Sequence, residues 1–242
     1  MLTTYIAIIL ISLFAGFIQG FTGFGSALFA MPLFLLFMNA KTAVPLCILN
    51  GLLITTYLTI QLREHLDWKK IRPLIIGCIP GIIAGVYVLK KADNNWIKIS
   101  LGILLIGYAS FNLRFRPKLI KMPPFSPYIA GFATGLIGGT FSAGGPPTII
   151  YTMLAGWDKD GIKATLSGFF LVTGFLIACA QWVSGLTNNL VLQYLSISAL
   201  PIICGVYTGS LLYSRASTSS YIRLILILLI GMGILMILSA LR

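Results

Sequence analysis

The chain is interrupted by two glycine-rich stretches, Gly20-Phe21-Thr22-Gly23-Phe24-Gly25 and Gly138-Gly139-Thr140-Phe141-Ser142-Ala143-Gly144-Gly145. Each stretch lies between two apolar runs, so that a hydrophobic segment stops and then restarts a few residues later. Glycine permits backbone angles that other residues avoid. Interruptions of this kind are typical of helices that break at membrane depth.

Around these stretches the composition is that of a membrane protein. Of the 242 residues, 58% are hydrophobic and only 9% are charged, and the mean hydropathy is +0.98. A soluble domain carries about 25% charged residues. So few charges exclude a soluble enzyme, a disordered chain and a nucleic-acid partner. They predict a chain whose main partner is the lipid bilayer.

Ten apolar runs, separated by charged or turn-rich gaps, predict an all-α polytopic membrane protein. The runs cover residues 3–20, 26–38, 42–62, 71–89, 97–113, 127–141, 146–154, 162–183, 190–213 and 219–241. Six of them approach the ~20 residues that a spanning helix needs. The other four form the two glycine-interrupted pairs.

The two halves of the sequence resemble each other. Gly16-Phe17-x-x-Gly20-x-x-Gly23 recurs as Gly131-Phe132-x-x-Gly135-x-x-Gly138, and the segment 82–87 recurs at 202–207 in similar form. An internal duplication explains both matches, and chance similarity between glycine-rich helices is the alternative. The duplication predicts a first transmembrane repeat over 1–115, a basic linker over 116–126 and a second repeat over 127–242.

The distribution of Lys and Arg among the gaps distinguishes two topologies. If each glycine-interrupted pair is one kinked span, the 17 basic residues divide nine against eight between the two sides of the membrane. If each pair is a hairpin of half-helices that enters and leaves on one side, they divide twelve against five, with Lys159 and Lys163 counted in one gap. The hairpin arrangement therefore agrees with the positive-inside rule. It predicts an inverted second repeat, a cytoplasmic basic loop at 114–121 and periplasmic termini.

These motifs resemble those of the sulfite exporter TauE/SafE family, also called the toluene-sulfonate uptake permeases. The resemblance rests on Gly20–Gly25 followed by Pro32, and on Gly131-Phe132-x-x-Gly135-x-x-Gly138-Gly139 followed by Gly144-Gly145-Pro146-Pro147. It covers essentially the whole chain. It implies a transporter of small anions, commonly sulfite or organosulfonates, in the bacterial inner membrane. It leaves the cargo and the direction of transport open.

An anion inside the bilayer needs hydrogen-bond donors and a positive potential. No apolar run carries Lys or Arg near its centre, so backbone N–H groups at the start of a helix are the expected donors. The segments that restart at Ser26 and Pro146 offer such groups, which predicts an anion site between the two glycine-rich stretches. The predicted substrate-binding residues are Thr22, Gly23, Phe24, Gly25, Ser26, Asn50, Thr140, Ser142, Ala143, Gly144, Gly145, Pro146 and Thr173.

Some polar and small residues have a second interpretation. Glycines spaced at four, such as Gly81 and Gly85, are expected to serve close helix packing. Asn50 and Thr173 either line the anion path or bond a neighbouring helix, and for Gln19 and Gln181 the packing role is favoured. The four cysteines lack metal-ligand spacing and are expected to be buried hydrophobes.

No catalytic residue, metal or cofactor is expected. The chain has one histidine, His65, and its acidic residues all lie in gaps: Glu64, Asp67, Asp93, Asp158 and Asp160. A membrane-embedded enzyme and a buried proton relay therefore lack candidate groups. A coupling ion (H⁺ or Na⁺) and a homodimer stay open as further partners. A passive anion channel and a transporter of a different small organic anion are the alternative functions.

Overall fold

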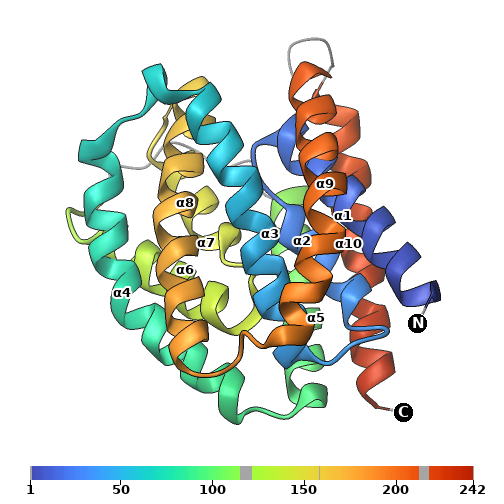
Figure 1. Ribbon diagram of the computed structural model, residues 1–242. Coiled ribbons are helices and arrows are strands. Elements are labelled where there is room, and N and C mark those ends of the chain that lie inside the picture. Colours follow the sequence, from blue (N-terminus) through green and yellow to red (C-terminus); the bar gives the residue numbers. More distant parts are fainter. Residues whose placement is uncertain (1, 115–121, 158, 213–217, 242) are drawn as a thin grey trace.

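The computed structural model describes residues 2–114, 122–157, 159–212 and 218–241, and every regular element within them is helical (Figure 1). The elements are α1 (Leu2–Thr22), α2 (Ser26–Phe34), α3 (Ala40–Gln61), the 3-10 turn η1 (Arg63–His65), α4 (Trp68–Lys91), α5 (Asn94–Arg114), α6 (Ser126–Phe141), α7 (Gly145–Leu154), α8 (Lys159–Val183), α9 (Asn189–Leu212) and α10 (Thr218–Ala240). Each predicted apolar run forms one of these α-helices. The predicted all-α fold is confirmed.

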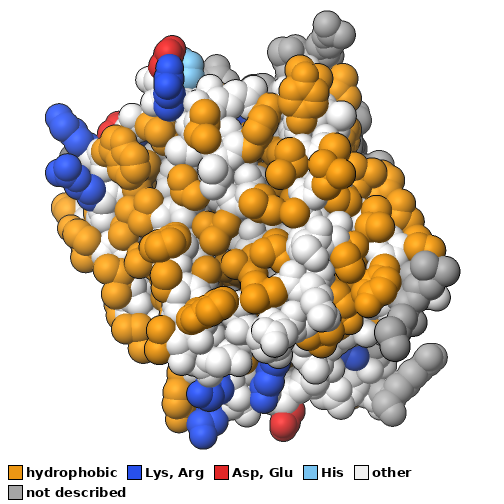
Figure 2. Space-filling model, in the orientation of Figure 1, with side chains coloured by type: hydrophobic (Ala, Val, Ile, Leu, Met, Phe, Trp, Pro, Cys, Tyr) orange, Lys and Arg blue, Asp and Glu red, His pale blue; other side chains and the backbone are white. Residues whose placement is uncertain are grey.

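The helices have the length and surface of a multi-pass membrane protein. Within the described residues, six helices are long and apolar enough to cross a membrane, namely α1, α3, α4, α5, α8 and α9. Figure 2 shows hydrophobic side chains over the middle of the visible face and Lys and Arg gathered towards its two ends. This distribution suits an apolar belt in contact with lipid tails between two polar headgroup layers.

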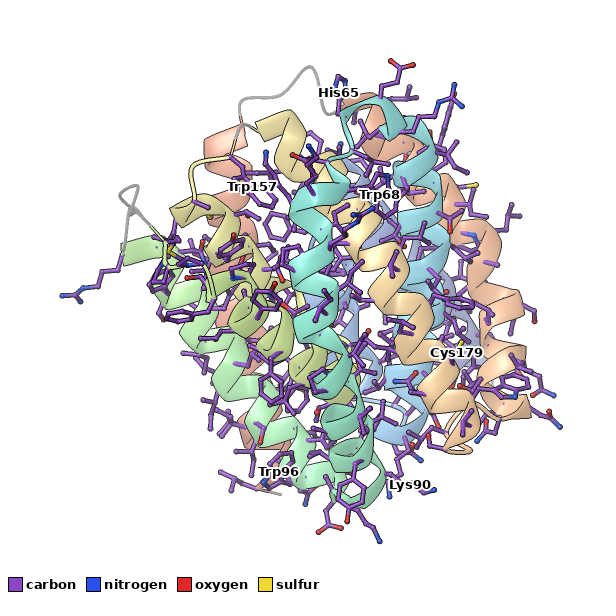
Figure 3. All side chains as sticks on the ribbon, turned by 90° about the vertical axis from the view of Figure 1, so that its left-hand side faces the viewer. His65, Trp68, Lys90, Trp96, Trp157 and Cys179 are labelled. Carbon is purple, nitrogen blue, oxygen red and sulfur yellow. The ribbon has the colours of Figure 1, made fainter. Side chains whose placement is uncertain are left out.

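The two ends of the bundle are named after residues that mark them in Figure 3. His65, Trp68 and Trp157 lie at one end, the His65 end, and Lys90 and Trp96 lie at the other, the Lys90 end. α1 begins and α10 finishes towards the Lys90 end (Figure 1). Arg114 finishes α5 at the His65 end, because α5 starts beside Lys91 and crosses the bundle once. The predicted basic loop 114–121 and the linker 116–126 lie largely outside the described residues.

The two glycine-interrupted pairs are hairpins that open at opposite ends of the bundle. The α1–α2 hairpin opens at the Lys90 end, where the Ala40 N–H that follows it donates to Asn94 Oδ1 at 2.8 Å. The α6–α7 hairpin opens at the His65 end, where the Trp157 ring that follows it lies 4.9 Å from Lys70 Nζ. The predicted inversion of the second repeat remains a proposal, and this opposed placement supports it.

The first hairpin differs in one respect from the predicted pair of half-helices. α1 has 21 residues and is long enough to cross the membrane, whereas α2 has only 9. The prediction of a half-helix is therefore wrong for α1. Gly16 and Gly20 do not break the helix, because both pack against the backbone of α9.

Each hairpin packs against a helix of the opposite half of the chain through glycines on the facing helix surfaces, and these rows of glycines are called glycine ridges. A Cβ on Gly81 of α4 would lie 2.2 Å from the Phe132 carbonyl oxygen of α6, and a Cβ on Gly205 of α9 would lie 2.1 Å from the Leu13 oxygen of α1. Such short distances mean that the two backbones touch. The packing role predicted for glycines spaced at four is confirmed at Gly81 and Gly85, where α4 meets α6.

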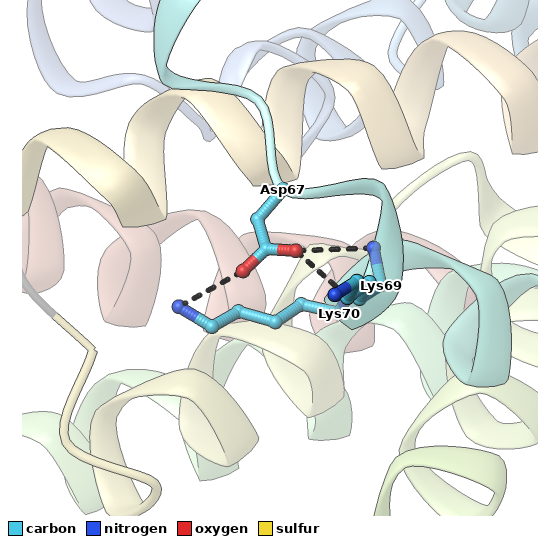
Figure 4. Close-up of polar contacts among 3 residues, drawn as sticks. All are labelled: Asp67, Lys69 and Lys70. Atoms are coloured by element: carbon cyan, nitrogen blue, oxygen red, sulfur yellow. Dashed lines mark hydrogen bonds and ion pairs between the residues drawn. The ribbon is translucent and has the colours of Figure 1, made fainter.

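The ends of two central helices are fixed by capping side chains. Asn39 accepts the Thr42 N–H at the start of α3. Asp67 accepts the N–H groups of Lys69 and Lys70 at the start of α4, and its carboxylate lies 3.4 Å from Lys70 Nζ (Figure 4). Slight desolvation raises the pKa of Asp67. The hydrogen bonds from Lys70 and Lys69 outweigh that effect and bring this pKa below its ordinary value.

The cysteines follow their expected burial only in part. Cys47 and Cys78 are buried, whereas Cys179 and Cys204 are exposed on the outside of the bundle. The expectation of four buried hydrophobes is wrong for the last two. Both lie within apolar spanning helices, so that lipid rather than protein surrounds their side chains.

Candidate functional site

The middle of the bundle contains a cavity of about 90 Å³ between the tips of the two hairpins. A water molecule needs ~10–15 Å³, so this cavity has room for a small oxyanion. α3 and α8 both contribute to its wall, and both present residues from the middle of their length. The residues that they contribute are Cys47, Ile48, Gly51 and Thr55 from α3, and Phe170, Thr173, Gly174 and Ile177 from α8.

The tip of the first hairpin brings the start of α2 to this cavity. Gly25 precedes the helix with a φ of +98°, a left-handed conformation that favours glycine. The chain therefore turns sharply enough for Phe24, Gly25, Ser26, Ala27 and Leu28 all to line the cavity. The first N–H groups of a helix have no partner within it, so Ser26, Ala27 and Leu28 present donors at this point.

A buried polar pair holds this tip against α1. The Ser26 hydroxyl donates to Gln19 Oε1, and both side chains are buried and line the cavity. Because Oε1 is used in this bond, the Nε2 group is the part of Gln19 that remains as a donor. Gln19 therefore combines the packing role expected for it with a place in the cavity wall.

The tip of the second hairpin brings the start of α7 to the opposite side. Ser142, Ala143, Gly144 and Gly145 line the cavity there. A Cβ on Gly144 would lie 2.5 Å from the Thr134 carbonyl oxygen, so only glycine allows the returning chain to lie this close to α6. One turn further along α7, the hydroxyls of Thr134 and Thr148 bond each other and join the two arms of the hairpin.

The electrostatics of the cavity favour an anion without any charged side chain in its wall. No Lys, Arg, Asp or Glu is found among the described residues that line it. The starts of α2 and α7 both face it, and each helix start carries roughly +0.5 of an elementary charge. Two such ends that converge on one small space make it attractive to a negative ligand.

Eight of the thirteen predicted site residues lie together in the cavity wall. They are Phe24, Gly25, Ser26, Ser142, Ala143, Gly144, Gly145 and Thr173. Thr173 and Gly174 of α8 and Gly51 of α3 all line the cavity, and the correspondence of Gly51 with Gly174 is visible in the sequence as a polar residue followed by glycine in each half. Binding by these residues remains a prediction.

The other five predicted residues lie around the cavity and not in its wall. The Thr22 hydroxyl donates to the Ile18 carbonyl, and Thr140 donates to Leu136 and, across the helix interface, to Gly85. Asn50 receives the Ser198 hydroxyl at 2.7 Å and bonds Ser12, so it joins α3 to α9 and α1. Gly23 packs against the Lys163 side chain, and Pro146 has no N–H with which to bind an anion.

Sequence reasoning missed several residues that line the cavity. They are Ala27, Leu28, Cys47, Ile48, Gly51, Thr55, Thr134, Gly138, Phe170, Gly174 and Ile177, and Gln19 was assigned to packing. For α3 a usable signal exists, because Gly51 and Thr55 follow Cys47 at spacings of four, which places them on one helix face. The apolar residues carry no such signal, since apolar types also face lipid in this chain.

Lys163 lies within the predicted run 162–183, although the charge tally counts it with the gap before that run. It belongs to the first turns of α8, and its side chain is only 6% exposed. Its Nζ donates to the Gly20 carbonyl at 3.0 Å, in the last turn of α1. A cation at the negative end of a helix dipole is favourable. Lys163 therefore fixes the end of α1 just before the tip that reaches the cavity.

The described residues hold no group of three or more His, Cys, Asp or Glu side chains suited to a metal ion. His65 is exposed at one end of the bundle (Figure 3), and it is not among the residues that line the cavity. The cavity offers hydrogen-bond donors and a positive potential, which are the requirements for binding an anion.

Comparison with known proteins gives two matches. The family described as sulfite exporter TauE/SafE matches residues 8–236. A protein of Cupriavidus necator, described as a probable sulfite/organosulfonate exporter TauE, is 24% identical over 181 residues, which cover 73% of this chain and 71% of that protein. The comparison with solved structures finds no significant match.

Proposed function

This chain belongs to the sulfite exporter TauE/SafE family, whose members are transporters and not enzymes, and we propose that it is a secondary transporter of small sulfur-containing oxyanions. Sulfite and organosulfonates are the cargo classes that we propose, in line with the description of the Cupriavidus necator relative. The multi-pass helical fold agrees with this class of protein. We place it in the bacterial inner membrane.

The observation that carries this proposal is the convergence of two helix starts on one small central cavity. Backbone N–H groups of α2 and of the loop before α7, together with Gln19 Nε2, are the donors around the space. The Thr55 and Thr173 hydroxyls also line it, but each donates its proton to a carbonyl of its own helix. A trigonal or tetrahedral oxyanion presents several acceptor oxygens in different directions. Such a ligand accepts hydrogen bonds from both hairpin tips at once.

The arrangement also suits alternating access. One tip belongs to a hairpin that opens at the Lys90 end, and the other to a hairpin that opens at the His65 end. An anion bound to both tips would be released to one side when one hairpin moves and to the other side when the other moves. We propose H⁺ or Na⁺ as the coupling ion, and a homodimer as one oligomeric state open to the chain.

Transport by purified protein in proteoliposomes tests the function. We expect saturable uptake of sulfite or of a sulfonate such as taurine, with counterflow from vesicles loaded with the same anion. Flux without saturation and without counterflow would indicate the alternative, a passive channel. Uptake of a small carboxylate but of no sulfur anion would contradict the proposed cargo.

A pair of glycine variants tests the site separately. A Cβ at Gly51 meets no atom within 4 Å, and neither does a Cβ at Gly107, which is exposed on α5. Gly51→Leu fills the cavity without a backbone clash and is expected to abolish sulfite binding and transport. Gly107→Leu projects towards lipid and is the matched control. Equal sulfite affinity in the two variants would refute the cavity as the binding site.

A further inference from the structure

Gln181 is a buried polar side chain whose amide has no partner within the described structure. It is 0% exposed, and neither its Nε2 nor its Oε1 bonds another described residue. A buried amide that lacks partners destabilises the folded state. The packing role favoured from the sequence requires a bond to a neighbouring helix, and this side chain makes none. Both hydrogen-bonding groups of the amide are therefore available to a water molecule or a ligand.

The position of Gln181 on α8 relates this amide to the central cavity. Thr173 and Ile177 line the central cavity, and Gln181 follows them at the same spacing of four. It also follows Gly174, another wall residue, by seven positions, which is about two helical turns. Residues at these spacings share one face of a helix. Gln181 therefore continues the cavity wall by one further turn.

That further turn leads from the cavity towards the Lys90 end. The Ser184 carbonyl, less than one turn beyond Gln181, accepts a hydrogen bond from Lys90 Nζ at 3.0 Å. The end of α8 thus meets the end of α4, where Lys90 lies in Figure 3. An anion that leaves the cavity along this face of α8 passes Gln181 before it reaches the Lys90 ammonium group.

We propose that Gln181 forms a second binding position for the oxyanion between the central cavity and the Lys90 end, an inference that rests on the proposed transport function. Nε2 donates to an oxygen of the anion, and Oε1 accepts from a water molecule that travels with it. An uncharged amide binds an anion less tightly than a lysine does, so the anion can leave again. This property suits a position on a path better than a storage site.

The opposite side of the cavity shows a related feature. Thr59 of α3 follows the wall residue Thr55 by four positions, in the direction of the His65 end. Its Oγ1 is buried and has no hydrogen-bond partner among the described residues. Unpaired polar atoms therefore occur one turn beyond the cavity on both α3 and α8, in opposite directions.

The test compares sulfite transport with sulfite binding in the same variants. Gln181→Met keeps the length of the side chain and removes both hydrogen-bonding groups. Gln181→Glu keeps the shape and places a carboxylate that repels the anion. Gln193→Met, on the exposed surface of α9, is the matched control. Initial rates are measured in proteoliposomes, and equilibrium binding of sulfite is measured on the purified protein in detergent.

We expect Gln181→Met to bind sulfite within about twofold of wild type, because the central cavity is intact. The carboxylate of Gln181→Glu is expected to weaken sulfite binding by at least about fivefold, because it repels the anion from one turn away. The turnover of both variants is expected to fall about tenfold, the effect of one lost hydrogen bond to a charged ligand. Gln193→Met should match wild type in both measurements. If Gln181→Met does not assemble, Gln181→Leu, which also lacks hydrogen-bonding groups, replaces it.

Two results would overturn the proposal, and they can be told apart. Wild-type turnover in the assembled Gln181 variants would show that the amide does not act on the path, while the transport function itself stands. Absence of transport of any sulfur anion by the wild-type protein would refute the proposed function and this inference together.

Discussion

At the residue scale, Lys163 is a charged side chain that contacts the tip of the first hairpin. Its Nζ bonds the Gly20 carbonyl, and its Cγ would lie 2.8 Å from a Cβ on Gly23. Lys163→Met removes the charge and keeps the length. A unit charge contributes about 1 kcal/mol even at ~15 Å when the effective dielectric constant is 20. We expect the dissociation constant for sulfite to rise about fivefold, as measured by equilibrium binding.

Lys41→Met is the control for this prediction. Lys41 is exposed at the start of α3, at the Lys90 end, where solvent screens its charge. Its loss should leave the dissociation constant within about twofold of the wild-type value. An equal effect of both substitutions would mean that net charge, and not the position of Lys163, controls affinity.

Individual residues also show where sequence reasoning succeeds and where it stops. The tips at Gly25 and at Gly144–Gly145 could be located because glycine is required where a helix stops and restarts. Gly51 and Ile177 could not, because whether a small or apolar residue faces a cavity or lipid depends on how the helices rotate against one another. The burial of Lys163 was not predictable, because a lysine near the end of an apolar run usually reaches the headgroup layer.

At the scale of helices, the glycine ridges between α4 and α6 and between α1 and α9 predict a measurable loss of stability. A methyl group on Gly81 meets the Phe132 carbonyl oxygen at 2.2 Å, which forces the backbones apart. Gly81→Ala is expected to destabilise the protein by about 1–3 kcal/mol, the range for overpacked cores. Thermal unfolding in detergent measures this loss.

Gly231→Ala provides the comparison for this substitution. Gly231 lies inside α10, is exposed, and a Cβ there meets no atom within 4 Å. Alanine favours the helix over glycine by roughly 0.5–1 kcal/mol in water. We expect an unchanged or slightly higher unfolding temperature. A similar loss in both variants would contradict a packing role for the ridge.

The bounds of the helices were largely predictable, whereas their three-dimensional roles were only partly so. The helices α3 and α4 begin directly after the capping residues Asn39 and Asp67. The helices α1 and α6 end at a glycine-rich stretch. α1 was expected to be a half-helix because a glycine-rich stretch follows it. The spacing of Gly16 and Gly20 predicts close helix packing, and in the structure both lie against the backbone of α9, but the spacing does not identify the partner helix.

At the scale of the whole molecule, the orientation in the membrane can be tested by labelling. The 17 basic residues favour a cytoplasmic His65 end when each interrupted pair is a hairpin, and the hairpins of the structure agree with that premise. In a background without the four native cysteines, Lys69→Cys is expected to react with an impermeant maleimide only after the membrane is opened. Lys41→Cys is expected to react in intact spheroplasts.

The reverse pattern would invert the proposed topology. Reaction of both cysteines from one side would instead contradict the assignment of Lys41 and Lys69 to opposite ends. Transport by each variant confirms that the labelled protein is folded.

The pairing of α1 with α9 also has a consequence for biosynthesis. Gly20 leaves the ribosome long before Gly205, although the two helices pack backbone to backbone in the finished protein. At about 5–20 residues per second, the ribosome needs roughly 10–40 s to synthesise the chain between them. During this interval α1 sits in the insertion machinery or in lipid without its final neighbour. We expect a translation-arrest force profile to show the α1–α9 contact only after α9 has emerged, so the first helix to be made is among the last to be locked in place.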